Sequence, residues 1–220
     1  ACVAARDAAT GCPFSRKELI DQLGVLFLAG HETTASALTW LFFILSVHPP
    51  TVARIRREVA EVAGDGEIRF EHVRHLAFTK RVFKETLRLY PPITFIPRVA
   101  MAPTRIGRFR VKRGAMIMIS PWTTHRNHAF WPEPAVFDPE RFAPEREAAI
   151  APGTFLPFGL GPRTCIGQGF AYTEAALIVA RLVRRFDFQC IEPERVRPVA
   201  RLTTRPVRQI MCRAIRRDGP

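Results

Sequence analysis

One helical pattern of about thirty residues, from about Arg16 to Val47, limits the folds open to this chain. Ser15 and Glu18 form the capping-box pattern that begins a helix, and the prolines after Val47 end it. At 1.5 Å per residue the helix would be about 45 Å long. Its ends are apolar, but the central segment His31–Thr34 argues against a membrane span, because a buried ionisable residue costs about 2.5–3.5 kcal/mol there. We therefore expect a helix through the core of a large protein.

Composition narrows the class of protein. The net charge of +13 comes from scattered residues, and no basic run interleaved with aromatics indicates a nucleic-acid partner. Five cysteines in irregular spacing, with no CxxC pair, indicate neither a zinc ribbon nor a disulfide framework. This pattern favours a reducing compartment. We expect a cytoplasmic, bacterial protein, and membrane attachment stays open because any anchor would precede Ala1.

The remaining patterns predict a mainly α fold with small β-sheets. The stretch Ile96–Ser120 alternates apolar and polar residues around Lys112–Gly114, which predicts a hairpin. Pro121–Pro157 is rich in proline and aromatics and is expected to be irregular, and Val199–Ile215 to form short strands. Three further helices are predicted, at about Thr51–Ala63, Phe78–Tyr90 and Gly167–Phe186.

A loop with one cysteine precedes the last predicted helix. Residues 158–167 read FGLGPRTCIG and place Cys165 among glycines. A thiolate is a soft ligand that suits an iron centre. Gly161 and Gly167 would let the backbone and a flat ligand approach closely, because neither has a Cβ. With the cation of Arg163 nearby, the loop is interpreted as a cofactor cradle.

A second constellation lies in the middle of the long helix, where residues 29–34 read AGHETT. Gly30 inside a helix costs about 1 kcal/mol relative to alanine, so a compensating role is expected. Glycine and threonines together can open the helical backbone, and the carboxylate of Glu32 beside the hydroxyl of Thr33 could relay protons. The alternative is a packing glycine with satisfied polar neighbours.

The third pattern consists of charged residues. Glu85 and Arg88 are three residues apart on one predicted helix and are therefore neighbours on one face. The alternative here is a surface ion pair worth little free energy. Arg141, in the segment Asp138–Phe142, is a polar anchor for the irregular stretch.

In this order, the motifs resemble the C-terminal half of a cytochrome P450, from about Ser15 onward. AGHETT resembles the family's oxygen-binding helix, Glu85-x-x-Arg88 its conserved pair and Pro139–Phe142 its meander motif. The loop matches the family's heme-ligand signature, at Phe158, Gly161, Arg163, Cys165 and Gly167. The resemblance implies the P450 fold for this half, with residues 1–220 a partial domain whose N-terminal half is absent.

The resemblance also implies heme b (iron protoporphyrin IX) as cofactor. Cys165 would be the metal ligand, as an axial thiolate favoured by the helix N-terminus that follows. Phe158 would shield the sulfur, and Arg163 and Arg98 would pair with heme propionates. The other implied roles are room over the heme face at Ala29 and Gly30, catalytic oxygen and proton handling at Thr33 and Glu32, and a buried network of Glu85, Arg88 and Arg141.

By the same resemblance the function is that of a heme-thiolate monooxygenase. It would insert one atom of O2 into a small hydrophobic organic substrate, with electrons from NAD(P)H through a ferredoxin, flavodoxin or reductase partner. Because the chain has about half a family member's length, the alternative is a truncated, non-catalytic remnant that at most binds heme or a partner. The four other cysteines, Cys2, Cys12, Cys190 and Cys212, are expected to be inert small hydrophobes.

Overall fold

The computed structural model describes residues 6–7 and 11–217, so Cys2 lies outside the described residues. The first helix, α1, spans Arg16–Val47, and the capping box of Ser15 and Glu18 is confirmed. Helix α2 spans Pro49–Ala63 and begins two residues earlier than predicted. Its two prolines occupy the first helical turn, where an N–H group would have no intrahelical partner.

The other two long helices match their predicted positions to within one residue at each end. They are α3, Ala77–Leu89, and α6, Gln168–Arg185. The stretch expected to be irregular contains α4 at Pro121–Thr124, the 3-10 turn η3 at Pro139–Phe142 and α5 at Pro144–Ala148. Further 3-10 turns are η2 at Phe70–His75, η4 at Gly161–Arg163 and η5 at Pro193–Arg195.

Four small antiparallel sheets of two strands each complete the described residues. The pairs are β1 (Ile96–Val99) with β4 (Met116–Ile119), β2 (Thr104–Ile106) with β3 (Phe109–Val111), β5 (Phe186–Cys190) with β8 (Cys212–Arg216), and β6 (Pro198–Ala200) with β7 (Thr204–Pro206). The fold is therefore mainly α with small sheets, as predicted.

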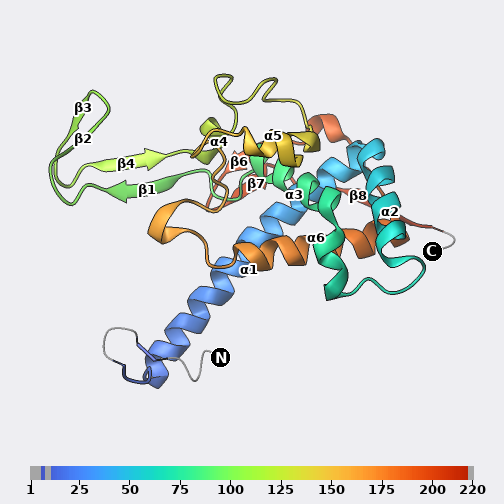
Figure 1. The fold of residues 1–220 in the computed structure, drawn as a ribbon, viewed down its shortest axis with the longest axis horizontal. Helices are drawn as coiled ribbons and strands as arrows, with labels where there is room; N and C mark the ends of the chain where they lie inside the picture. Colours follow the sequence, from blue (N-terminus) through green and yellow to red (C-terminus); the bar gives the residue numbers. More distant parts are fainter. Residues whose placement is uncertain (1–5, 8–10, 218–220) are drawn as a thin grey trace.

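The hairpin was predicted correctly, but its turn was not. The chain reverses at Gly107, which has a φ of +55°, between β2 and β3. Lys112–Gly114 instead forms a second turn on the returning side, where the Gly114 N–H donates to the Ala100 carbonyl at 2.8 Å. Both turns use glycine at positive φ, which a residue with a Cβ adopts at a cost. The four strands form an arm that extends away from the helices (Figure 1).

The core lies where the C-terminal half of α1 meets α2, α3 and α6. Trp40 on α1 is fully buried and stacks on Tyr90 with ring centroids 4.1 Å apart. By contrast, the N-terminal half of α1 extends away from the other helices (Figure 1) and exposes apolar side chains such as Leu23, Phe27 and Leu28. Among the described residues, only α1 and α2 taken together have the length and composition of a membrane span, and they are bent by 106°.

Candidate functional site

The most completely bonded group in the molecule is the guanidinium of Arg88 on α3. It donates two hydrogen bonds of 2.7 Å to the carboxylate of Glu85, one turn earlier on the helix. Its other three N–H groups donate to backbone carbonyls of His125, Pro134 and Val136, at 2.9, 2.8 and 3.1 Å. All five donors of the guanidinium are thus used. Neither side chain of the pair is accessible to solvent, so the surface-pair alternative does not apply.

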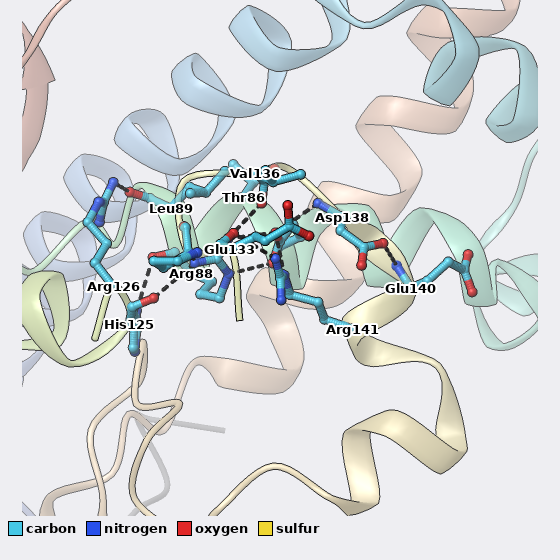
Figure 2. A network of polar contacts seen from close by, with 12 residues as sticks. Thr86, Arg88, Leu89, His125, Arg126, Glu133, Val136, Asp138, Glu140 and Arg141 are labelled. Carbon is cyan, nitrogen blue, oxygen red and sulfur yellow. Dashed lines mark hydrogen bonds and ion pairs between the residues drawn. The ribbon is translucent and has the colours of Figure 1, made fainter. Parts of the chain in front are cut away.

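Arg141, from η3, completes this buried network (Figure 2). Its Nε lies 3.4 Å from a Glu85 oxygen, and its Nη2 donates to the Glu133 carbonyl at 2.9 Å. The Asp138 N–H also donates to Glu85 at 2.9 Å. Burial raises the pKa of Glu85, and its bonds to Arg88 and the Asp138 N–H oppose that rise. The structure thus brings the three predicted residues together and ties α3 to residues 133–141.

Sequence reasoning gave His125 no specific role, but the structure places it inside this network. The Leu156 N–H donates to His125 Nε2 at 2.9 Å, so Nε2 is an acceptor and Nδ1 carries the proton. Nδ1 then donates to the Arg88 carbonyl at 3.2 Å. Burial, first of all, lowers the pKa of His125 to about 3. A neutral imidazole therefore joins α3 to the segment that leads into the Cys165 loop, defined as residues 158–167.

The Cys165 loop is closed by the cysteine's own backbone. The Cys165 N–H donates to the Phe158 carbonyl at 2.9 Å, and the Thr164 N–H to the Gly161 carbonyl at 3.0 Å. Gly161 has a φ of +73°, and a Cβ added there would meet open space. At Gly167 an added Cβ would lie 3.7 Å from the sulfur. The Cys165 side chain is exposed, and Gln168, three residues later, begins α6.

The apolar side chains in this loop and just after it differ in burial. Phe158 is partly buried, packs against the core and contacts Tyr172 with centroids 5.3 Å apart. By contrast, Leu160, Ile166 and Phe170 are exposed by 57%, 89% and 70%. The loop and the first turn of α6 therefore carry apolar side chains that the described residues leave uncovered, close in sequence to the exposed thiol.

The two cations expected to meet propionates lie at the surface. Arg163 is in η4, and its side chain has no hydrogen bond or ion pair with any described residue. Arg98, on β1, donates only to the neighbouring Pro97 carbonyl, at 2.8 Å. Neither guanidinium is neutralised by a carboxylate among the residues that the structure describes, so both can pair with an external anion.

The middle of α1 is a continuous α-helix, so the expected opening of the backbone at Gly30 is not present. The Thr33 hydroxyl donates to the Ala29 carbonyl at 2.6 Å, a bond within the helix that satisfies the hydroxyl without breaking the ladder. Ala29 and Gly30 are exposed, and no atom lies within 4 Å of a Cβ added at Gly30. The packing-glycine alternative therefore finds no support in the described part of the chain, where nothing packs on Gly30.

Glu32 has partners that no sequence pattern predicted. Arg205, on β7, donates to it from Nε at 2.9 Å and from Nη2, and the Thr203 hydroxyl donates at 2.7 Å. These bonds, the one from Arg205 first, lower the pKa of Glu32. Glu32 is thus held as a carboxylate at neutral pH. The residues lie more than 170 positions apart in sequence, and only the fold brings them together.

Comparison with known proteins identifies the family. A family model described as cytochrome P450 matches residues 2–213. Cyclooctatin synthase from Streptomyces melanosporofaciens is 42% identical over 212 residues, which cover 96% of this chain and 46% of that protein. Cyclooctat-9-en-7-ol 5-monooxygenase from the same organism is 39% identical over 86% of this chain and 40% of its own length.

A solved structure gives the same result for the fold. The heme domain of cytochrome P450DA superposes with a TM-score of 0.92 at 28% identity, over 99% of this chain and 49% of that one. The chain spans half or less of the length of the relatives it matches. Because the family model matches nearly every residue and the fold superposes over the same extent, the chain belongs to the cytochrome P450 family.

Proposed function

We propose that this chain is part of a heme-thiolate monooxygenase, a partial P450 domain over residues 1–220 with Cys165 as the metal ligand. One observation carries the proposal: the exposed Cys165 thiol lies in a glycine-containing loop directly before α6, with apolar surface beside it. A helix N-terminus stabilises a thiolate, because its free N–H groups and dipole favour negative charge.

The residues present fit a flat, largely apolar cofactor with acidic groups. Gly161, where an added Cβ would meet open space, and Gly167, where it would lie 3.7 Å from the sulfur, place no side chain in the way of such a cofactor. Leu160, Ile166 and Phe170 supply uncovered apolar surface. Arg163 and Arg98 would pair with a heme propionate by charge-assisted hydrogen bonds. When bound through a thiolate, heme supplies the activation of dioxygen for transfer of one oxygen atom to an organic substrate.

The protein's own contribution on the α1 side comes from four residues. Ala29 and Gly30 leave space for O2 and substrate, since neither presents a large side chain. The Thr33 hydroxyl can exchange its bond to the Ala29 carbonyl for one to a ligand. Glu32 holds no proton while Arg205 binds it, so it delivers one only after that guanidinium moves away.

Substrate and partners follow from the family and its relatives. One relative is a cyclooctat-9-en-7-ol 5-monooxygenase, which supports a small hydrophobic organic substrate here. Family members generally use O2 and a redox partner, so we propose a ferredoxin, flavodoxin or reductase that passes electrons from NAD(P)H. The expected cytoplasmic location stays a prediction.

A second candidate is favoured by the exposed apolar half of α1. Ile20, Leu23 and Phe27 lie on a helix that the described residues leave uncovered. Exposed apolar surface of this kind marks a contact site or a liability. For the 220 residues alone, we therefore also consider a non-catalytic remnant that at most binds heme or a partner.

The test is spectroscopic. The whole protein containing this chain, reduced and exposed to carbon monoxide, is expected to show the strongly red-shifted Soret band of thiolate ligation. Cys165→Ala should abolish the shift, and the control Cys12→Ala should retain it. An unshifted band that Cys165→Ala leaves unchanged would refute the proposed ligand. For the 220-residue chain alone, we expect weak heme uptake or none, and stoichiometric uptake by the purified chain would contradict that expectation.

A further inference from the structure

Two cysteines with no place in the proposed oxygen chemistry lie directly opposite each other. Cys190 ends β5 and Cys212 begins β8, and the antiparallel register pairs them. The two cysteines are 22 residues apart in sequence, so no short motif such as CxxC indicates that they form a pair. The sequence pattern predicted two inert small hydrophobes, whereas the fold places the two thiols on facing strands.

The hydrogen bonds around the pair define its geometry. The Ile191 N–H donates to the Met211 carbonyl at 2.8 Å, just beyond the pair, and the Arg217 N–H donates to the Arg185 carbonyl at 2.9 Å at the other end of the ladder. Hydrogen-bonded and non-hydrogen-bonded pairs alternate along an antiparallel ladder. Counting from either end places Cys190 and Cys212 in a non-hydrogen-bonded pair.

Side chains come closest in pairs of this kind. Their Cα atoms are typically about 4.5 Å apart, within the range of about 4.4–6.8 Å that a disulfide accepts. The two thiols already interact: burial and then the neighbouring Cys212 raise the pKa of Cys190. Both are reduced, Cys212 is exposed, and Cys190 is half-buried, so a small reagent can reach the pair.

We propose that Cys190 and Cys212 form a redox-active thiol pair that closes to a cross-strand disulfide with a low-molecular-weight disulfide such as oxidised glutathione. One thiolate attacks the reagent's S–S bond and releases one glutathione thiolate, which gives a mixed disulfide. The second cysteine, as its thiolate, attacks the protein sulfur and releases the other glutathione. The two protein thiols lose two electrons and two protons, and the reagent gains them as two thiols.

Closure would fasten the last strand to the helical core. Strand β5 packs on α1, where Phe188 contacts Phe42 with centroids 5.0 Å apart, and Asp187 pairs with Arg56 of α2 at 2.6 Å. Strand β8 has five residues, all exposed, and β5 is the strand that pairs with it. A disulfide closing a loop of this length raises the midpoint of thermal unfolding by about 5–10 °C.

The experiment is thiol mapping. The purified protein is incubated with oxidised glutathione at pH 8.5, free thiols are alkylated, and the peptides are assigned by mass spectrometry, with a parallel sample in urea. Native protein should give the Cys190–Cys212 disulfide as its dominant crosslink together with the higher midpoint. In urea, disulfides that include Cys165 should become about as frequent as the Cys190–Cys212 disulfide.

Single variants complete the test. Cys190→Ser and Cys212→Ser should each stop at a glutathione adduct on the remaining cysteine, without the rise in midpoint. Equal frequencies of the Cys190–Cys212 disulfide in native and urea-treated protein would overturn the proposal. So would a native product that carries only glutathione adducts, or only unreacted thiols, at these two positions.

Discussion

Arg88 and Glu85 form a two-point ion pair, 2.7 Å at both contacts, with no solvent access to either side chain. Taking two charges out of water is costly, and the cost is offset here because every remaining donor of Arg88 meets a backbone carbonyl. Those carbonyls belong to residues 125–136, which form little regular structure of their own. The ion pair therefore fixes the irregular segment 125–136 onto α3, and its main role is to position that segment.

Arg88→Gln should lower the free energy of unfolding by about 3–5 kcal/mol, because it leaves the buried Glu85 carboxylate with a weaker partner and several carbonyls without donors. Urea denaturation followed by circular dichroism measures the change. The matched control is Arg146→Gln, which removes an exposed arginine that pairs with Asp138 at 3.0 Å. That change should cost less than 1 kcal/mol. Equal losses in the two variants would contradict the buried role.

The buried imidazole of His125 makes stability depend on pH. Its pKa is lowered to about 3 in the fold, whereas an exposed histidine titrates near 6.5. Between these values the unfolded chain binds a proton that the folded one does not. The stabilisation that comes from keeping His125 neutral is therefore complete above about pH 6.5. It is lost as the pH falls toward 3, and the free energy of unfolding then decreases by on the order of 4 kcal/mol.

Unfolding free energies of the wild type and of His125→Gln, measured from pH 7 to pH 4, check this. The variant should be less stable at pH 7 and should lose less stability on acidification. His128→Gln is the control, because His128 is an exposed residue three positions away. Parallel pH curves for the wild type and His125→Gln would show that another group carries the acid sensitivity.

Much of the fold could be predicted, because its signals are local. The capping box of Ser15 and Glu18 and the prolines after Val47 gave both ends of α1 correctly. The predicted position of the hairpin turn was wrong, because both Lys112–Gly114 and Gly107 have the composition of a turn. Both glycines have positive φ, and only the register of β2 with β3 shows which one reverses the chain.

The site divides in the same way. The spacing of three residues predicted that Glu85 and Arg88 are neighbours on one helix face. Their burial, however, depends on backbone carbonyls from residues 125–136, far along the chain. The hydrogen bonds from Arg205 to Glu32 and from the Leu156 N–H to His125 arise only in the folded molecule. Contacts between distant segments leave no periodic signal in sequence, so these partners could not be found before the structure.

Removing Arg205 should free the Glu32 carboxylate. Arg205→Gln is expected to raise the pKa of Glu32 toward its ordinary value, because the hydrogen bond from Arg205 is the first cause of its lowering. Carbon-13 NMR of the glutamate carboxyl groups follows the titration directly. Arg201→Gln, four residues earlier and exposed but with no acidic partner among the described residues, should leave it unchanged. A pKa of Glu32 that is the same in both variants would disprove the pairing in solution.

Gly30→Ala should make the helix more stable and the site less effective. An added Cβ at Gly30 meets no atom within 4 Å, so alanine should gain about 1 kcal/mol from its higher helix propensity. Gly24→Ala is the matched control, since Gly24 is equally open on the same helix and, six residues away, faces another direction. Both variants should unfold at higher urea concentration. In the reduced whole protein, only Gly30→Ala should slow carbon monoxide binding several-fold, because its methyl group occupies the space we propose for O2. Equal binding rates in the two variants would show that Gly30 does not face the ligand.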